Sequence, residues 1–191
     1  NVSALAVGNS EIHWEDIWAM LLANLLFVYL DFSAYCDLAI GSGRTAGIKV
    51  PENFNLPLVR SGIGGFWRNW HMTLSNWVMR RVYFSVFLSF RSRYLSTLSC
   101  MLVIAVWHAP TLSWFAWAVH HGSALHAQNV ITEKLSRNPF WQKRKDLVFV
   151  RLATYSIGIV FVWFWVALGH SFTLFTDAEL AFNVYSSAFG F

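Results

Sequence analysis

Charged residues are scarce in this sequence. Asp, Glu, Lys and Arg together make up 13% of its 191 residues, whereas hydrophobic residues make up 56%. Soluble domains carry about a quarter charged residues, and a soluble protein as apolar as this one would expose large adhesive patches. The shortage of charge argues against an ordinary soluble domain and predicts a protein whose solvent is the lipid bilayer.

Cysteine is also rare. Cys36 and Cys100 lie far apart in apolar surroundings, and no CxxC pair or Cys/His ligand spacing occurs. This pattern predicts two buried free thiols rather than a disulfide framework. His120 and His121 are adjacent, so they point to different faces of a helix, and no carboxylate accompanies them. We therefore predict no metal site and no bound cofactor.

The basic residues gather in two short clusters beside apolar stretches, although the net charge is only +4. Arg91 and Arg93 form one cluster, and Lys143, Arg144 and Lys145 the centre of the other. Such clusters are typical of cytoplasmic loops that face anionic lipid, whereas a nucleic-acid surface needs basic residues without intervening membrane spans. We expect contact with membrane lipid, several passes through an inner or plasma membrane, and no nucleic-acid partner.

Several stretches have the length and composition of membrane segments. Residues 17–41 and 152–169 are apolar enough to cross a hydrocarbon core about 30 Å thick. Residues 94–129 are expected to enter the membrane and return, with a bend at His108 where Pro110 interrupts the helix. Asp31 and Asp37 then lie at or near membrane depth, where pairing with Arg44 or with helix N-termini is the expected solution.

Other stretches do not span. Glycine and proline interrupt residues 41–65, and irregular backbone at membrane depth persists only if it packs against protein or lines a wet cavity. Residues 66–81 have the spacing of an amphipathic helix near the headgroups, and residues 171–191 that of a terminal one, while residues 132–146 read as a polar loop. The predicted fold is all-α: a polytopic integral membrane helical bundle with broken, re-entrant and interfacial helices.

Two of the histidines have an unusual setting. His71 and His108 each directly follow a tryptophan, and both lie near backbone broken by glycine or proline. A lone histidine in apolar surroundings is more often a structural hydrogen-bonding group. That interpretation suits His13 and His126, read as surface or loop residues, and His170, which comes just past a span.

Acyl transfer is the chemistry that best fits such histidines. Transfer of an acyl group from a thioester to a hydroxyl requires a base for the hydroxyl proton, and neutral imidazole has a pKa near 6.5, suited to that role. The sequence contains neither a GxSxG nucleophile elbow nor a Cys/His signature, which favours direct transfer over a covalent enzyme intermediate. A base within an apolar span would let donor and acceptor approach from opposite sides of the membrane.

Four motifs in this order resemble the membrane-bound O-acyltransferase (MBOAT) family, and in particular its bacterial branch that acetylates alginate or transfers D-alanine to teichoic acids. The motifs are Asp31–Arg44, Pro51–Pro57, Phe66–Ser75, and Trp107–His108 followed by Trp117 and His121–Gly122. The resemblance implies a polytopic helical enzyme with a funnel and a tunnel that meet near an essential histidine. By motif position that residue is His108, and His71 is the second histidine of the family pattern.

The resemblance covers residues from Ile17 to the C-terminus and implies that residues 1–191 are the C-terminal part of one catalytic domain. The chain begins at Asn1 without a charged region and cleavage site, so we expect a portion of a longer protein and not a signal peptide. The family's Trp-His-Gly appears as Trp107-His108-Ala109, and Ala118 follows Trp117 where the family has glycine. The short segment between His71 and His108 favours the polysaccharide-acetylating branch.

Our hypothesis from the sequence is an acetyl transferase that passes an acetyl group from a cytoplasmic thioester donor to an exported polysaccharide or a relay protein. The donor is acetyl-CoA or an acyl carrier protein, and a periplasmic or extracellular acyltransferase is the expected partner. His108 is the predicted catalytic base or acyl-transfer residue, and His71 orients a group or completes the polar path. The candidate substrate-binding residues are Arg68, Ser75, Asn55, Trp107 and His121.

Two alternatives remain open from the sequence. The first is transfer of D-alanine or another acyl group from a carrier protein to a cell-wall polymer, which uses the same chemistry with a different donor. The second is a membrane scaffold or transport subunit without catalytic activity, in which both His71 and His108 are structural. The second predicts that substitutions of these histidines lower the amount of protein rather than its activity per molecule.

Overall fold

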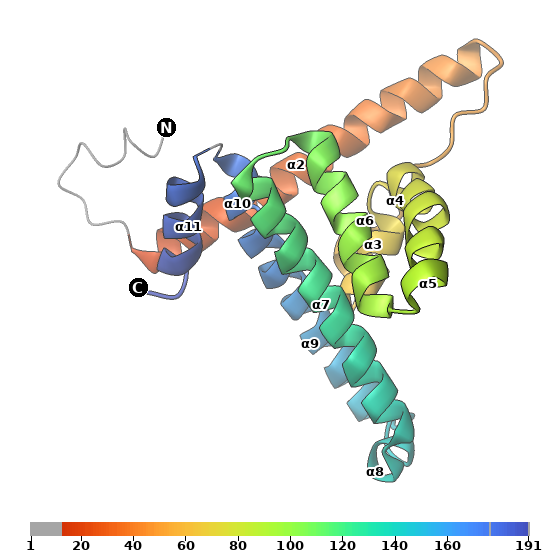
Figure 1. The fold of residues 1–191 in the computed structure, drawn as a ribbon, viewed down its shortest axis with the longest axis vertical. Coiled ribbons are helices and arrows are strands. Elements are labelled where there is room, and N and C mark those ends of the chain that lie inside the picture. The colour runs from red at the N-terminus through yellow and green to blue at the C-terminus, as the bar shows by residue number, and fades with distance from the viewer. Residues whose placement is uncertain (1–12, 176, 191) are drawn as a thin grey trace.

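The computed structural model describes residues 13–175 and 177–190, and every regular element within those ranges is helical (Figure 1). The prediction of an all-α chain is confirmed for this part. Three long helices form the frame: α2 (Trp14–Thr45), α7 (Leu112–Arg137) and α9 (Val148–Gly169). The two stretches Trp14–Thr45 and Val148–Leu174 are long and apolar enough to cross a bilayer, as predicted from residues 17–41 and 152–169.

Shorter helices fill the space between the long ones. After α2 the chain returns through an irregular segment and the one-turn helix η1 (Pro57–Val59) to α3 (Ile63–Asn69). The next three elements run on as one helical stretch with a π-helical turn in its middle. They are α4 (Met72–Val78), η2 (Met79–Tyr83) and α5 (Phe84–Phe90).

Local sequence sets the ends of α6 (Arg93–His108) and α7. Arg91 has left-handed backbone with φ 54°, and Ser92 caps α6 by accepting a hydrogen bond from the main-chain N–H of Leu95 at 3.2 Å. Ala109 is extended after α6, and Thr111 caps α7. The break predicted at His108 is therefore confirmed, and it brings α6 and α7 back against each other (Figure 1).

Three boundaries differ from the prediction. Residues 66–81 are not one helix, because Trp70 and His71 leave helical geometry between α3 and α4. The expected polar loop 132–146 is partly helical: α7 continues to Arg137, and α8 (Pro139–Gln142) follows. The tail is split into α10 (Ser171–Leu174) and α11 (Ala178–Ser187). The spacing of apolar and polar side chains in a sequence does not reveal where one or two residues leave the helix.

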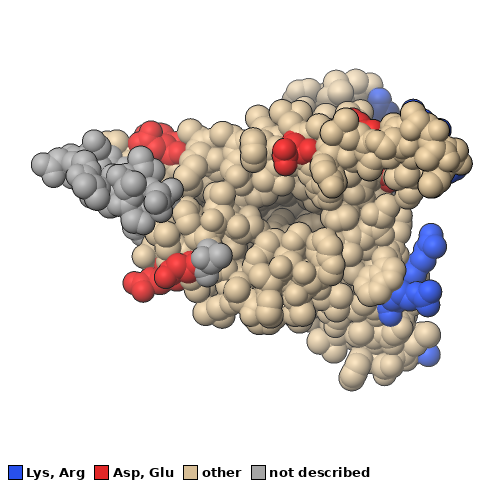
Figure 2. All heavy atoms as spheres, turned by 90° about the horizontal axis from the view of Figure 1, so that it is seen from above, with Lys and Arg blue, Asp and Glu red and all other residues tan. Residues whose placement is uncertain are grey.

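The expected pairing of Asp31 and Asp37 with Arg44 is wrong. Both carboxylates lie on exposed parts of α2, and Arg44 is 4.0 Å from Glu52 instead. Figure 2 shows a central hollow with largely uncharged walls on the face it presents, with basic residues toward one edge and an acidic side chain near the rim of the hollow.

The apolar core has two parts. One joins α2, α3 and α9 around Leu21, Ile63 and Val162, and the other joins α4, α6 and α7 around Ile104 and Ala118. The aromatic ring of Trp67 and the side chain of Leu125 pack against both parts. The histidine cavity described below lies where these two parts of the core meet.

Candidate acyl-transfer site

His71 occupies a strained position. Trp70 is extended, with φ −107° and ψ 128°, and His71 is left-handed, with φ 45° and ψ 52°. A residue other than glycine in this region costs about 1–3 kcal/mol, so its surroundings must hold it there. The strained backbone places the imidazole at the junction of two short helices, α3 and α4.

Asn53 stabilises this junction through both its main chain and its side chain. Its carbonyl oxygen accepts a hydrogen bond from the N–H of Met72 at 2.9 Å. Its Oδ1 accepts from the N–H of Thr73 at 3.2 Å and from the Thr73 hydroxyl at 2.9 Å. Asn53 is itself buried, at 8% exposure. The irregular segment Pro51–Pro57 therefore packs against the junction that carries His71.

The same contacts fix the protonation of the His71 ring. His71 Nδ1 lies 3.1 Å from Asn53 Oδ1, the atom that accepts from the N–H of Thr73 and so must be the oxygen. Nδ1 therefore carries a proton, and in the neutral ring the lone pair is on Nε2. Burial lowers the pKa of His71, which favours this neutral form. The Nε2 atom of His71 can therefore accept a hydrogen bond from a molecule in the cavity, while Nδ1 is engaged by Asn53.

His108 is held by aromatic rings at the last residue of α6. Its ring stacks on Trp114 with centroids 4.3 Å apart and planes 6° apart, and it meets the ring of Trp107 edge to face with centroids 4.6 Å apart. Trp107 also lies 6.1 Å from the ring of His71. Trp114 belongs to α7, so the bend after α6 is what brings this ring beneath His108.

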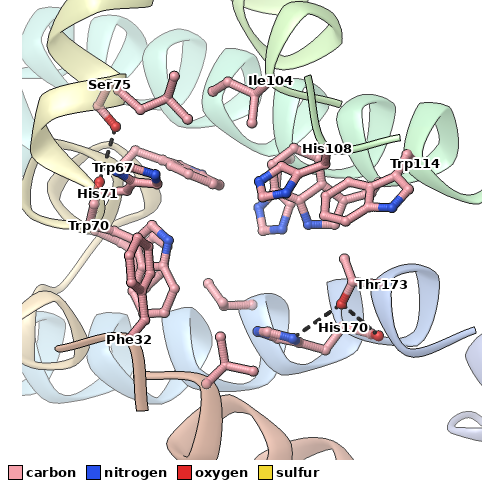
Figure 3. A pocket seen from close by; sticks show the side chains of 16 residues that line it. Phe32, Trp67, Trp70, His71, Ser75, Ile104, His108, Trp114, His170 and Thr173 are labelled. Carbon is pink, nitrogen blue, oxygen red and sulfur yellow. Dashed lines mark hydrogen bonds between the residues drawn. The ribbon is translucent and has the colours of Figure 1, made fainter. Parts of the chain in front are cut away.

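A cavity of about 310 Å³ brings the two histidines together (Figure 3). His71, His108, His121 and His170 all line it, from four different elements or their ends, and its remaining walls are mainly aromatic or aliphatic. No Lys, Arg, Asp or Glu is among the described residues that line it. An apolar cavity with a few convergent polar groups is the usual form of a small-molecule or reaction site.

His121 is the most enclosed of these four histidines, at 1% exposure. Its ring packs between Trp67 and Trp117, with centroid distances of 5.2 and 4.8 Å. Gly169 permits this packing, because a Cβ at that position would lie 2.7 Å from His121 Nε2. Neither His121 Nδ1 nor Trp67 Nε1 has a hydrogen-bond partner among the described residues, although both are buried.

His120 points away from the cavity, as expected for the neighbour of His121 on a helix. Its Nε2 lies 2.9 Å from the carbonyl oxygen of Trp165, and its ring stacks on the indole of Trp165 with centroids 4.2 Å apart. The Tyr185 hydroxyl is 3.4 Å from its other ring nitrogen. His120 therefore joins α7, α9 and α11 and has a structural role.

A second cavity, of about 470 Å³, lies on the other side of Trp67, Ser75 and Ile104, which line both cavities. Its lining includes Arg68 and Arg80 and, among the described residues, no histidine. Cys100 also lines it, with its thiol 3.6 Å from the carbonyl oxygen of Val78. The chain thus has two adjoining spaces, one with neutral rings and one with permanent cations.

The structure separates the residues selected from the sequence. His71, His108, His121 and Ser75 line the first cavity. Trp107 is 61% exposed and contacts the histidines from outside the lining. Arg68 lines the second cavity, and the exposed side chain of Asn55 reaches neither. The main chain of Asn55 instead joins Asn69 and Arg60, through hydrogen bonds of 3.0 and 2.8 Å. The functional roles of all these residues stay predictions.

Sequence reasoning missed Asn53, His170 and Arg80. Asn53 is one of the amides between the two prolines, and that concentration of amides in an apolar chain was the available signal. His170 was read as a residue just past a span, whereas its ring lines the first cavity. Arg80 gave no signal, because a cation near the end of an amphipathic helix is ordinary. Within residues 13–175 and 177–190, no group of three or more potential metal ligands occurs.

Comparison with known proteins identifies the family of this chain. The model of the MBOAT, or membrane-bound O-acyltransferase, family matches residues 13–176. The chain therefore belongs to the membrane-bound O-acyltransferase family, as its motifs predicted.

Three curated relatives illustrate the range of the matches. The chain is 34% identical over 123 residues to the probable alginate O-acetylase of Pseudomonas aeruginosa, a match that covers 61% of this chain and 23% of the relative. It is 33% identical over 119 residues to the peptidoglycan O-acetyltransferase of Helicobacter pylori, covering 61% and 23%. It is 28% identical over 138 residues to the teichoic acid D-alanyltransferase of Bacillus subtilis, covering 63% and 35%. The chain thus spans a quarter to a third of these relatives.

Proposed function

We propose that this chain is the histidine-bearing part of a multi-pass O-acyltransferase of the inner or plasma membrane. The enzyme moves an acetyl group from a cytoplasmic thioester to a hydroxyl of an exported polysaccharide or of a relay protein. Membership of the family and the O-acetyltransferases among its relatives support the reaction class. The observation that carries the proposal is the convergence of His71 and His108 on one largely apolar cavity.

The roles of the two histidines follow from their different settings. His108, held by stacking on Trp114, is the proposed base that takes the proton of the acceptor hydroxyl. The attacking hydroxyl has one proton, which it donates to His108, so the lone pair on His71 Nε2, fixed by Asn53, accepts a hydrogen bond from a neighbouring donor group of the acceptor and orients it. General base catalysis of this kind contributes about 100- to 10,000-fold.

The transfer needs no covalent enzyme intermediate. The hydroxyl oxygen attacks the thioester carbonyl carbon while its proton passes to a His108 ring nitrogen, and the thiolate that leaves then takes the proton. Ser75 and Thr173 are the hydroxyl side chains in the cavity lining, and each lies within hydrogen-bond distance of a main-chain carbonyl oxygen, at 3.0 and 3.1 Å. Their engagement with the backbone supports direct transfer between substrates.

The second cavity suits the donor. Donors such as acetyl-CoA and acyl carrier proteins carry phosphate groups, which Arg68 and Arg80 would bind by charge-assisted hydrogen bonds. The shared wall of Trp67, Ser75 and Ile104 is then the place where the acyl end reaches the histidines. The acceptor, brought by a polysaccharide chain or an extracellular acyltransferase partner, would reach the histidine cavity from the opposite side.

Substitution of His108 tests the proposal. Cells that carry the full-length protein with His108→Ala or His108→Gln should lose the acetyl groups of their surface polymer while the protein remains in the membrane at normal amounts. The matched control is His126→Gln, because His126 packs on Tyr94 and lines neither cavity. Normal acetyl content in the His108 variants would refute the assignment, and loss of the protein itself would favour a structural role.

D-alanyl transfer from a carrier protein is the second candidate, supported by the match to a teichoic acid D-alanyltransferase. It would use the same two histidines. Mass analysis of the acyl group on surface polymers, with and without the protein, separates acetyl from D-alanyl transfer.

A further inference from the structure

His170 is a fourth histidine in the first cavity, and the acyl-transfer roles proposed above do not use it. Helix α9 ends at Gly169, and the turn into α10 places the ring in the cavity wall. Figure 3 shows the ring with one nitrogen toward Thr173 and the other toward the middle of the cavity, on the side that faces His71 and Trp70. The nitrogen toward Thr173 is Nδ1, so Nε2 is the one that points into the cavity.

The orientation of the Asn24 amide sets the tautomer of this ring. In the structure the Nδ2 group of Asn24 faces His170 Nδ1 at 3.0 Å. With the amide in this orientation its NH₂ group donates to Nδ1, which places the proton of the neutral ring on Nε2. The Thr173 hydroxyl, 3.3 Å from Nδ1 and 3.1 Å from the carbonyl oxygen of His170, is shared between these two acceptors.

The pairing also accounts for an isolated polar residue. Asn24 is the one polar side chain in the otherwise apolar run Ile17–Leu30 of α2. An amide among apolar groups is costly unless it has a partner. Its partner is His170, so α2 carries this amide to the wall of the histidine cavity.

His71 and His170 therefore present opposite groups to the same space. In His71, Asn53 accepts from Nδ1 and leaves a lone pair on Nε2; in His170, Asn24 donates to Nδ1 and leaves an N–H on Nε2. The base takes the proton of the attacking hydroxyl, and the orienting acceptor binds a neighbouring donor group of the acceptor molecule. The carbonyl oxygen of the thioester instead gains negative charge during attack and needs a donor.

We propose that His170, with its tautomer set by Asn24, is a further catalytic residue that donates a hydrogen bond from Nε2 to the carbonyl oxygen of the acyl group. This inference rests on the proposed acyl transfer. As the hydroxyl oxygen forms its bond to the carbonyl carbon, the C=O electron pair moves to oxygen and the hydroxyl proton moves to His108. Collapse of the intermediate restores C=O and expels the thiolate, which takes that proton. His170 keeps its own proton throughout.

The test uses the full-length protein in isolated membranes, with acetyl-CoA as the probe and the release of free CoA thiol together with polymer-bound acetyl as readouts. His170→Leu removes the donor at similar volume and should lower kcat about 100- to 1,000-fold with little change in KM, because the interaction forms in the transition state. His170→Gln places an amide donor near the position of Nε2 and should retain activity well above that of His170→Leu.

Asn24→Asp provides a second, independent variant. A carboxylate accepts a proton from Nδ1, so wherever the ring is neutral Nε2 carries the lone pair and the donor is lost, whereas the imidazolium that the carboxylate favours at lower pH keeps an N–H on Nε2. Activity should therefore fall as in His170→Leu at alkaline pH and recover as the pH is lowered, whereas Asn24→Gln, which keeps an amide, should be affected less at every pH. A purely structural role would lower the amount of folded protein and leave kcat per molecule unchanged.

The outcomes separate this inference from the proposed function. If His108→Ala is inactive while His170→Leu keeps a kcat within threefold of the unmodified protein, the role of His170 is wrong and the acyl-transfer proposal stands. If His170→Gln is as inactive as His170→Leu, donation from this position is also contradicted. Full activity of His108→Ala would overturn the proposed function and this inference together.

Discussion

The two cavities share Trp67, Ser75 and Ile104 and differ in the chemistry of their remaining walls. The first collects four histidines and, among the described lining residues, no charged side chain; the second collects Arg68 and Arg80 and no histidine. Neutral imidazoles exchange protons near physiological pH, whereas arginine holds its charge. The proposed function therefore places proton transfer in the first cavity and recognition of a phosphate-bearing donor in the second, on either side of one wall.

The free-energy cost of burial explains why histidines line one cavity and arginines the other. A neutral ring can be buried in an apolar cavity if its nitrogens find partners, and Asn53 and Asn24 supply such partners to His71 and His170. A guanidinium group is far more costly to bury, and both Arg68 and Arg80 are exposed residues beside the second cavity. The comparison predicts that changes in the first cavity alter the chemical step and that changes in the second alter donor binding.

Asn53→Leu should have the largest effect, on the chemical step itself. It removes the acceptor that holds His71 Nδ1 and Thr73, so the ring loses its fixed position, and misplacement of a reacting group costs about 100-fold in rate. Acetyl transfer per molecule of membrane-inserted protein measures the effect. Asn55→Leu is the matched control in the same segment, since its side chain reaches neither cavity. Equal losses in both variants would contradict the specific role of Asn53.

Arg68→Gln combined with Arg80→Gln should raise the KM for acetyl-CoA and leave kcat unchanged. The two side chains are exposed and screened, so each contributes roughly tenfold or less. Steady-state kinetics on isolated membranes measures both constants. Arg81→Gln is the control because this cation does not line the second cavity. A fall in kcat with unchanged KM would place the arginines in the chemical step and contradict the assignment of donor binding to the second cavity.

Asn53→Asp should shift the pH dependence of the reaction. A carboxylate next to Nδ1 favours the imidazolium form and so opposes the burial that lowers the pKa of His71. His71 would then protonate, and lose its Nε2 lone pair, at a higher pH than in the unmodified protein. The acidic limb of the kcat profile should move up by about one pH unit. An unmoved limb would show that His71 need not be neutral.

Gly158→Ala should destabilise the protein without a direct effect on either cavity. A Cβ at Gly158 would collide with the carbonyl group of Ser61, so α9 and the segment before α3 must separate. Overpacking of this kind costs about 1–3 kcal/mol. At Gly41 no atom lies within 4 Å of an added Cβ, so Gly41→Ala is the control. Thermal denaturation in detergent measures both; a decrease confined to Gly158→Ala is expected.

Two of the long helices were predictable from the sequence, because residues 17–41 and 152–169 are apolar over a length that suffices to cross a bilayer. The bend after His108 was equally predictable, since Pro110 prevents a continuous helix. The interruption at Trp70 and His71 was not predictable from the sequence. The side-chain spacing there fits one helix, and the hydrogen bonds from Met72 and Thr73 to Asn53 that favour the break come from a distant segment.

The candidate site was predictable to a similar extent. His71, His108 and His121 were selected by their motifs and lie on one cavity, whereas Arg68 lies beside the second cavity and Asn55 outside both. His170 escaped selection because its role depends on a turn after α9 and on a partner in α2, 146 residues earlier in the chain. Pairings over such distances have no local signature.

The separation of proton transfer from donor binding is tested most directly by kinetics with the full-length protein in membranes. The rate of thiol release is measured as a function of the acetyl-CoA concentration. We predict that the variant with both Arg68→Gln and Arg80→Gln reaches the rate of the unmodified protein at saturating donor. His71→Ala and His108→Ala should remain at least about 100-fold slower at every concentration. Recovery of the histidine variants at high donor concentration, or failure of the arginine variant to recover, would contradict the account.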